Sequence, residues 1–426
     1  MTTAPIARPG TSLRERVEAA KAASRVLARM SGAERSTMLD EIAEALIRRT
    51  PEILAENQDD IADARGARVA GSIVDRLFLD EHRVADMAAA VRQVAALPDP
   101  VGEVTSGWRR PNGLEISATR VPLGVIAVIY EGRPNVTTDA AALCLKSGNA
   151  VILRGSSVAR RSNRILGEVI AGALREAGVP AGAVTSLGVD RDEMLQLVKM
   201  NDLVDLVIPR GGPELKETLG QHATVPVIYA AAGNCHVYID RDADLDMARD
   251  IVVNAKVQRP GVCNAAETLL VHREIAKDAL PTLVDALVGE GVELRISDEV
   301  RQVLGARYPD LSPAMPDDFA TEFLSLTLAV GIVGSVDEAI AHINAYGTGH
   351  SEAIVTRSLG SARAFQEGVD SACVYVNAST RFTDGGEFGM GAEIGISTQK
   401  LHARGPVGLE QLTTVKYLIT GDGHVR

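Results

Sequence analysis

The sequence predicts an α/β protein with two parallel-sheet domains and a helical segment in front of them. From residue 121 onward, runs of consecutive apolar residues such as Val125–Tyr130 alternate with segments of helical periodicity such as 137–147. Apolar strands separated by helices are typical of a parallel sheet covered on both faces. A second series of this kind begins at His236, and 426 residues are too many for one ordinary core.

Composition limits the classes of partner. The chain has 46% hydrophobic and 23% charged residues, as a globular protein does, and a formal net charge of −12. This charge argues against nucleic acid or an anionic membrane as the main partner. An anionic substrate would need a local basic pocket.

Four cysteines, at positions 144, 235, 263 and 373, have no CxxC or paired spacing. We therefore expect neither a disulfide framework nor a metal site. The first ten residues lack the apolar core of a signal peptide, and no apolar run is long enough to cross a bilayer. These features predict a cytoplasmic protein.

Residues 11 to 100 are predicted to be helical, with apolar residues at three- and four-residue spacing. Ser31–Glu34 has the form of a capping box, and Ser72–Asp75 offers a similar helix start. The sequence Pro-Asn-Gly at 111–113 then predicts a hairpin within 104–120. The tail at 412–420 has the pattern of an exposed strand that needs an edge to pair with.

The first α/β series is predicted to carry an anion site. Ligands of parallel sheets bind at the carboxyl ends of strands. Three of these ends pair glycine, which lets the backbone approach a phosphate, with arginine, which neutralises it. Ordinary turns with solvated arginines are the alternative, and no GxGxxG follows the first strand. The strands are expected at 125–130, 150–154, 183–187, 203–208 and 225–229, and the three loops at 130–133, 154–157 and 209–212.

The second series contains a cysteine on a turn. A helix over 244–256 is stopped by Pro260 and Gly261, and a buried strand follows at 268–271. A thiolate at Cys263 would be a good nucleophile, and its own N–H group could help to hold an oxyanion. The alternative is a buried apolar cysteine. Polar neighbours weigh against that alternative: Gln258, Arg259, Asn264 and Glu267.

In combination, several stretches resemble the aldehyde dehydrogenase superfamily, and within it the branch that reduces an acyl phosphate. The matching stretches are 128–137, 148–155, 208–212, 235–240, 253–260 with Cys263 and Asn264, 267–270, 346–350 and 388–395. The resemblance implies a Rossmann-like cofactor domain over 1–103 and 121–230, and a catalytic domain over 231–403. It also implies an oligomerisation ribbon of 104–120 and 404–426, in which the hairpin pairs with the C-terminal strand and docks on a second subunit.

The resemblance further implies NADPH-dependent reduction of L-glutamyl 5-phosphate to L-glutamate 5-semialdehyde and phosphate through a thioester on Cys263. This is the second step of proline biosynthesis from glutamate. It implies a homo-oligomer, a functional association with a separate glutamate 5-kinase, and no metal. The implied residues are Cys263 and Asn135 for catalysis; Arg154, Gly155, Ser156, Pro209, Arg210, Gly211, Gly212 and Glu322 for the cofactor; and Glu131, Arg133, Arg259 and Asn264 for the substrate.

Two other readings compete. An aldehyde-oxidising dehydrogenase of the same fold would need a glutamate that activates water, and Ala230 stands where that glutamate would fall. The second competing hypothesis is a Cys-His hydrolase or a binding protein without catalytic activity. His272, at the end of a strand, is more typical of a surface or core histidine than of a general base. The sequence leaves open NADPH against NADH, dimer against tetramer, and the residues at the amino-acid end of the substrate.

Overall fold

The structure is a computed structural model that describes residues 11–230 and 232–426. The residues divide into two compact units by their internal contacts. Unit 1 comprises Met1–Tyr229, Gly389–Gly395 and Val407–Arg426, and unit 2 comprises Ala230–Phe388 and Ile396–Pro406. The N-terminal ten residues, for which we expected no signal peptide, lie outside the described part of the chain.

Residues 11 to 100 of unit 1 are mainly helical, as predicted. Ser31 and Glu34 form the expected capping box, and Ser12 and Glu15 form another. The capping start predicted at Ser72 is wrong, because the N-cap is Ala70, two residues earlier, and the helix begins at Gly71. The helices are α1 (Leu13–Leu27), α2 (Gly32–Arg48), α3 (Thr50–Gly66), α4 (Gly71–Leu77) and α5 (Glu81–Ala96).

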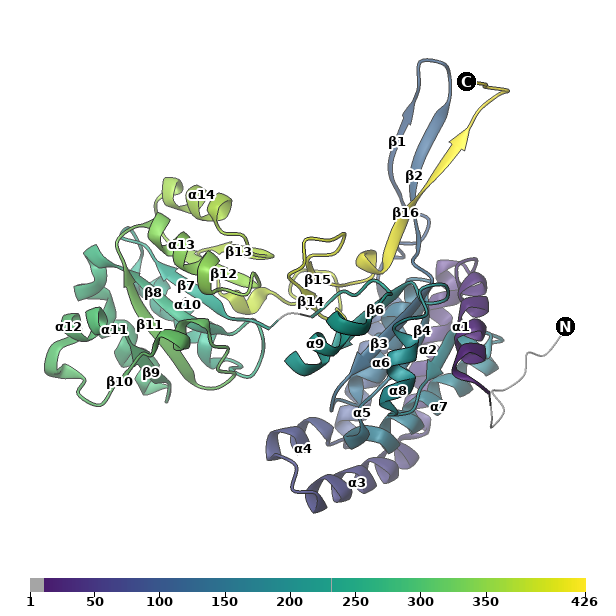
Figure 1. Ribbon diagram of the computed structural model, residues 1–426, viewed down its shortest axis with the longest axis horizontal. Coiled ribbons are helices and arrows are strands. Elements are labelled where there is room, and N and C mark those ends of the chain that lie inside the picture. Colours follow the sequence, from purple (N-terminus) through teal and green to yellow (C-terminus); the bar gives the residue numbers. More distant parts are fainter. Residues whose placement is uncertain (1–10, 231) are drawn as a thin grey trace. The chain divides into compact units, whose positions relative to one another are not determined.

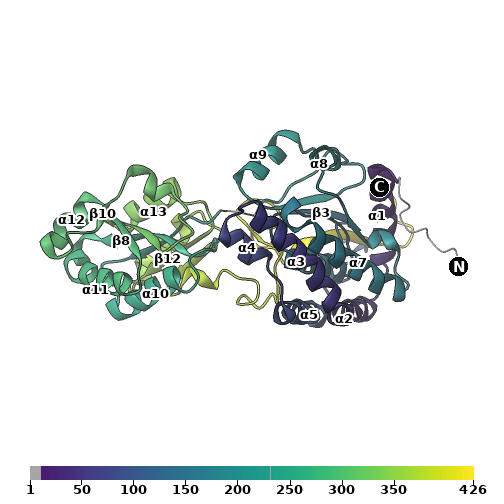
Figure 2. The ribbon, with the colours of Figure 1, turned by 90° about the horizontal axis from the view of Figure 1, so that it is seen from below.

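A four-stranded parallel sheet follows, in the order β5-β4-β3-β6. All six residues of β3 are buried, which explains its continuous apolar sequence. The fifth strand predicted at 225–229 is wrong: there Val227 makes a single bridge to Val207, and Pro226 has no N–H to extend a ladder. The strands are β3 (Val125–Tyr130), β4 (Ala150–Arg154), β5 (Val184–Ser186) and β6 (Leu206–Arg210). The later helices of the unit are α6 (Asn135–Lys146), α7 (Arg160–Glu176), α8 (Arg191–Leu197) and α9 (Pro213–His222), and helices cover both faces of the sheet (Figures 1 and 2).

Unit 2 contains a seven-stranded parallel sheet in the order β10-β9-β11-β8-β7-β12-β13. Successive residues enter different cores: Val237 and Ile239 face one, and Tyr238 faces the other. Helices α10 and α11 pack on the first face, and α13 and α14 on the second (Figure 2). The main strands are β7 (Cys235–Ile239), β8 (Ala266–His272), β9 (Glu293–Ile296), β11 (Thr327–Val333), β12 (Ser351–Val355) and β13 (Cys373–Val376). The helices are α10 (Leu245–Val257), α11 (Ala276–Gly289), α12 (Asp298–Leu304), α13 (Val336–Tyr346) and α14 (Leu359–Gly368), and β10 (Ser312–Pro313) is the edge strand.

The ribbon is an antiparallel sheet of β1 (Val104–Arg109), β2 (Glu115–Pro122) and β16 (Thr413–Thr420). Within one chain, β16 pairs with β2 along its full length, which confirms the predicted pairing of the hairpin with the C-terminal strand. Gly113 adopts a φ of +98°, as the hairpin turn requires. The ribbon projects from the rest of unit 1 (Figure 1). Apolar side chains on it, such as Trp108 and Tyr417, are exposed.

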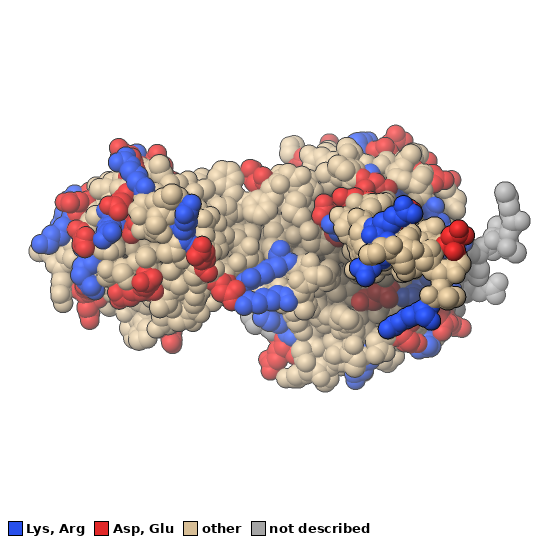
Figure 3. All heavy atoms as spheres, turned by 90° about the horizontal axis from the view of Figure 1, so that it is seen from above, with Lys and Arg blue, Asp and Glu red and all other residues tan. Residues whose placement is uncertain are grey.

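No helix in the described part of the chain is both long and apolar enough to cross a bilayer. On the face shown in Figure 3, acidic and basic side chains are interspersed over each unit.

A buried amide connects the helical segment to helix α7 of unit 1. Asn57 on α3 is fully buried; its Nδ2 donates to the Leu77 carbonyl at 2.8 Å and to the Ser162 hydroxyl at 3.0 Å. Its Oδ1 accepts the Leu79 N–H at 2.9 Å. These bonds fix α3 to α7 and to the segment after α4.

We predict that Asn57→Ala lowers the free energy of unfolding by about 2–4 kcal/mol, because it leaves several buried polar groups without a partner. Urea denaturation at 25 °C measures the change. The control is Asn201→Ala at an exposed position, expected within about 0.5 kcal/mol of the parent. Equal stability of the two variants would contradict the assigned role of Asn57.

Candidate active site

The three glycine-arginine loops of unit 1 lie next to one another, because β4, β3 and β6 are neighbours in a parallel sheet. The Glu131 N–H donates to the Arg210 carbonyl at 3.1 Å, and the Glu131 carboxylate accepts the Gly212 N–H at 3.1 Å. The Gly132 N–H donates to the Ser156 hydroxyl at 3.0 Å. A Cβ at Gly211 would lie 2.7 Å from the Glu131 carboxyl carbon. Residues predicted from three separate loops therefore form one cluster.

Arg154 lies half-buried at the end of β4. Its Nη2 donates to the Val189 carbonyl at 2.8 Å, while its Nε is buried without a hydrogen-bond partner among the described residues. Burial lowers the pKa of Arg154, and Glu131 partly opposes this effect. The next residue, Gly155, is packed so closely that a Cβ would lie 1.9 Å from Asn163 Nδ2. Pro209 is buried within β6, and the adjoining Arg210 is half-buried.

Asn135 is the first residue of α6, and its exposed side chain donates to Asp139 at 2.9 Å. Burial raises the pKa of Asp139 to about 6, although Asn135 and Arg210 both act to lower it. Arg133 is half-buried in the loop before this helix. Asn135 and Arg133 thus belong to the same unit as the cluster of loops.

The predicted cysteine turn is present in unit 2. Asp244 caps α10 by accepting the N–H groups of Asp246 and Met247, both at 3.1 Å. The helix ends at Val257, and β8 begins at Ala266. Between them Cys263 is half-exposed and forms no disulfide with a described residue, whereas the other three cysteines are buried. Cys263 is therefore the most exposed of the four cysteines.

The segment before β7, around Gly233, packs against the cysteine turn. A Cβ at Gly233 would lie 1.4 Å from the Cys263 carbonyl oxygen, so this approach requires glycine. The Cys235 thiol donates to the same carbonyl at 3.2 Å. The Gly233 N–H donates to Glu322 at 2.7 Å, and burial raises the pKa of Glu322. Glu322 thus lies beside the cysteine turn, in a different unit from Arg154.

Asn264 and Arg381 hold the turn from another side. The buried Asn264 donates from Nδ2 to the Thr383 carbonyl at 2.9 Å and accepts Arg381 Nη1 at its Oδ1. Arg381 Nε donates to Gln258 Oε1 at 2.8 Å. Arg259 is exposed on the same turn. The sequence reasoning missed Arg381, although it follows the carboxyl end of β13, where ligands of parallel sheets bind.

A buried ion pair lies on the core side of the turn. Lys256, near the end of α10, and Glu267, in β8, form this pair with fully buried side chains. Glu267 also accepts the Leu324 N–H at 3.2 Å. Burial raises the pKa of Glu267, and the contact with Lys256 opposes that rise. This pair ties the helix before the turn to the strand after it, and the sequence reasoning did not identify it.

Three histidines of unit 2, His236, His272 and His350, are buried within the protein. His272 is buried, and its Nδ1 accepts the Glu274 N–H at 3.1 Å, so it caps the next turn. His236 is buried against Glu352, with Nδ1 3.0 Å from the carboxylate. Burial lowers the pKa of His350 to about 4, which keeps it neutral near pH 7.

Comparisons with known proteins agree with this geometry. The model of the aldehyde dehydrogenase family matches residues 7–301. The gamma-glutamyl phosphate reductase of Thermoanaerobacter pseudethanolicus is 52% identical over 408 residues, which is 96% of this chain and 98% of that protein. The chain belongs to the aldehyde dehydrogenase family. Within the family it groups with the gamma-glutamyl phosphate reductases, and it is an oxidoreductase.

Further similar proteins agree with this grouping or share the fold. The gamma-glutamyl phosphate reductase of Carboxydothermus hydrogenoformans is 55% identical over 408 residues, covering 96% of this chain and 97% of that protein. The crystal structure of the reductase from Thermotoga maritima matches with a TM-score of 0.94 at 47% identity, covering 97% of this chain and 99% of that one. An acetylating aldehyde dehydrogenase from Geobacillus thermoglucosidasius shares the fold, with a TM-score of 0.66 at 19% identity over 97% of both chains.

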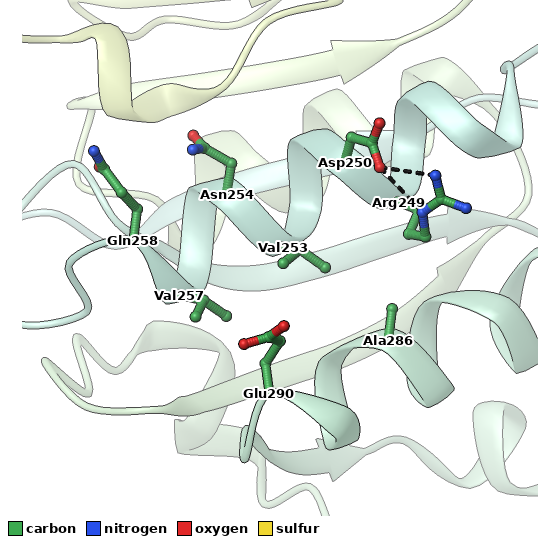
Figure 4. Close-up of a pocket in the computed structure, with 8 residues that line it drawn as sticks. All are labelled: Arg249, Asp250, Val253, Asn254, Val257, Gln258, Ala286 and Glu290. Carbon is green, nitrogen blue, oxygen red and sulfur yellow. Dashed lines mark hydrogen bonds and ion pairs between the residues drawn. The ribbon is translucent and has the colours of Figure 1, made fainter.

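A separate hollow of about 500 Å³ lies between α10 and α11 (Figure 4). Six of its lining residues come from α10 and its C-cap, and two come from the end of α11. Gln258 is the member that also contacts Arg381. The lining residues are Arg249, Asp250, Val253, Asn254, Val257, Gln258, Ala286 and Glu290, so the hollow does not contain the nucleophile candidate.

We predict that Gly233→Ala displaces the cysteine turn and slows alkylation of Cys263 by iodoacetamide. The rate should fall by about tenfold or more, because the reactivity of a cysteine depends on the exposure and the surroundings of its thiolate. Mass spectrometry of the labelled peptide measures the rate. Gly289→Ala on α11 is the control, because a Cβ there meets nothing within 4 Å. A parental labelling rate in the folded Gly233→Ala protein would contradict the proposed support of the turn.

Proposed function

We propose that the chain reduces L-glutamyl 5-phosphate, with NADPH, to L-glutamate 5-semialdehyde and phosphate, the second step of proline biosynthesis from glutamate. The observation that carries the proposal is the half-exposed Cys263 on a supported turn, in a chain that shares 52–55% identity with named gamma-glutamyl phosphate reductases over nearly its whole length.

The proposed chemistry uses Cys263 as the nucleophile. Its sulfur forms a bond to the acyl carbon of the substrate, the bond from that carbon to the phosphate oxygen breaks, and the electron pair leaves with phosphate. The product of this step is a thioester on Cys263. A bound nicotinamide cofactor, which enzymes of this family use, would supply a hydride. At Cys263 a carbon–hydrogen bond would then form at the acyl carbon and the carbon–sulfur bond would break, which releases the aldehyde and returns the electron pair to the sulfur as the thiolate.

Two features suit a reductase that must keep water from hydrolysing its thioester. Ala230 has no group that could act as a general base. Glu322 is engaged by the Gly233 N–H, and burial favours its protonated form. An acyl phosphate has a good leaving group, so the thiolate needs little further activation.

The cluster of loops in unit 1 fits a dinucleotide. Gly211 and Gly212 are exposed and carry no side chains, so the backbone can approach a phosphate closely. The unpartnered buried Nε of Arg154 offers a donor to an anion. We assign this cluster to the cofactor phosphates, with Arg154 and Ser156 toward the 2′-phosphate of NADPH. The full proposed set is Arg154, Gly155, Ser156, Pro209, Arg210, Gly211, Gly212 and, from unit 2, Glu322.

The remaining assignments concern substrate and intermediate. We assign Asn135 to stabilising the oxyanion, since its exposed amide carries donors. Glu131, Arg133 and Arg259 are assigned to the substrate. Asn264, expected among the substrate residues, uses both ends of its amide within the protein, and we assign it to holding the turn.

The test measures phosphate-dependent reduction of NADP by glutamate 5-semialdehyde, the reverse reaction, and compares NADP with NAD. We predict turnover that requires phosphate and falls by several orders of magnitude in Cys263→Ser, because an alcohol is a far weaker nucleophile near neutral pH. Cys144→Ala is the control, since this thiol is buried in α6. Near-parental activity of Cys263→Ser, or multiple-turnover oxidation of the semialdehyde to glutamate without phosphate, would contradict the proposal.

We also propose that the enzyme is a homo-oligomer that uses the ribbon as its contact surface. Exposed apolar residues on β1 and β16 support this assignment, because such a patch marks an interaction site: Val104, Trp108, Tyr417, Leu418 and Ile419. A functional association with a glutamate 5-kinase would deliver the reactive acyl phosphate directly. The four free cysteines agree with action in the reducing cytoplasm.

Deleting residues 411–426 should therefore give monomers or aggregates by light scattering, because β2 loses its partner strand and exposes its edge. A chain that ends at Thr420 retains β16 and should keep the parental assembly. If the longer deletion keeps both the parental oligomeric state and full activity, the ribbon is not the assembly surface.

A further inference from the structure

Arg381 places a positive charge beside the cysteine turn, and the groups that it donates hydrogen bonds to do not neutralise this charge. Among the described residues its guanidinium donates two hydrogen bonds, from Nε to Gln258 and from Nη1 to Asn264, and both go to amide oxygens that bear no net charge. They fix the plane of the guanidinium and leave Nη2 available to a ligand. An arginine held in this way is pre-organised to bind a planar or tetrahedral oxyanion.

The position of Arg381 is set by the turn itself. The Thr380 hydroxyl donates to the Asn264 carbonyl at 2.7 Å, so the segment that bears Arg381 is bonded to the residue next to Cys263. The Arg381 N–H is anchored by the Ser379 hydroxyl at 3.3 Å. Arg381 is thus built into the wall beside the nucleophile.

A second cation shares this location. Arg259 lies on the cysteine turn with an exposed side chain. Burial lowers the pKa of Arg381, and the charge of Arg259 lowers it further, whereas Asp384 and Cys263 act in the opposite direction. Two guanidinium groups that repel each other next to a nucleophile are stabilised when an anion binds between them.

We infer that Arg381, together with Arg259, binds the phosphoryl group of the acyl-phosphate substrate and stabilises it as it leaves. The inference rests on the proposed function and adds to it the residues for the leaving group. In the step, the sulfur–carbon bond forms and the carbon–oxygen bond to phosphate breaks. The electron pair stays on the phosphate oxygen, where the added negative charge is stabilised by the arginines.

The phosphoryl group is favoured over the carboxylate at the amino-acid end of the substrate. Phosphorus is separated by a single oxygen atom from the carbon that Cys263 attacks, whereas the carboxylate lies several bonds farther away. Since Arg381 is bonded to Asn264, which adjoins Cys263, the nearer anion matches its position. A phosphate also offers oxygens to both arginines at once.

Arg381→Gln, Arg381→Lys and Arg259→Gln are compared with the parent in the reverse reaction. Arg381→Gln should raise the KM for phosphate about ten- to a hundredfold, the usual range for losing a hydrogen bond to a charged group, and leave the KM for semialdehyde within twofold. Lysine at 381 should restore part of the loss. Arg259→Gln, at an exposed site, should raise the phosphate KM several-fold without affecting folding. Arg273→Gln is the control, because Arg273 pairs with Glu299 on the surface of the same unit.

A second measurement does not use turnover. Inorganic phosphate should slow iodoacetamide labelling of Cys263 in the cofactor-free protein, and Arg381→Gln should raise the half-protecting concentration at least tenfold. An unchanged phosphate KM and unchanged protection in the folded variants would overturn the inference. A rise in the semialdehyde KM alone would also overturn it, because that result assigns Arg381 to the carboxylate of the substrate. If the only effect of Arg381→Gln is slower labelling of Cys263 in the absence of phosphate, Arg381 is assigned to the thiolate and the inference is again wrong.

The proposed function can fail separately from this inference. If the parent shows no phosphate-dependent reduction of NADP, while phosphate still protects Cys263 through Arg381, the anion site stands and the assigned reaction is wrong. If turnover requires phosphate but the Arg381 and Arg259 variants keep the parental phosphate KM, the reaction stands and the assigned leaving-group residues are wrong.

Discussion

The site in unit 2 depends on one close backbone contact, between Gly233 and the carbonyl group of Cys263. Strands β7 and β8 are parallel neighbours, so the segments that precede them run side by side. A side chain at position 233 would occupy the space of the Cys263 carbonyl oxygen. Glycine at this position allows the two segments to meet. The Cys235 thiol then bonds the same carbonyl, and Glu322 bonds the Gly233 N–H.

The charged side chains around the cysteine turn differ in burial, and their partners differ accordingly. The buried Lys256–Glu267 pair balances itself on the core side, where an unpaired charge would be strongly destabilising. On the solvent side Arg381 is held by neutral amides and keeps its charge for a ligand. A chain with a net charge of −12 would repel an anionic substrate, so such local cations are what acyl-phosphate chemistry requires.

Much of the fold could be predicted from the sequence, because buried parallel strands leave a strong local signal. All six residues of β3 are apolar, and this strand lies where it was predicted. Prediction failed at 225–229, where an apolar run contains Pro226 and forms one bridge in place of a strand. The helix start at Ser72 failed because the observed N-cap, Ala70, makes no side-chain capping bond, so no capping residue marks the beginning of this helix.

The site was predicted only in part, for a related reason. Cys263 is marked by its own neighbours in the chain, and so are the glycine-arginine loops. Arg381, which was missed, reaches the turn through a contact between residues far apart in sequence, and no local pattern reports such a contact. Glu322 makes a similar distant contact, and it was expected only through the family resemblance. The requirement for glycine at position 233 likewise cannot be recognised in the sequence, because it arises where the segment before β7 meets the segment before β8.

The most direct test of the account is capture of the covalent intermediate. The protein is mixed with glutamate 5-semialdehyde and NADP in the absence of phosphate, quenched in acid, digested and examined by mass spectrometry. The account predicts a glutamyl group attached to the peptide that contains Cys263, and its loss when phosphate is added before the quench. A glutamyl group on another cysteine, or reduction of NADP in a single turnover with unmodified Cys263, would contradict it.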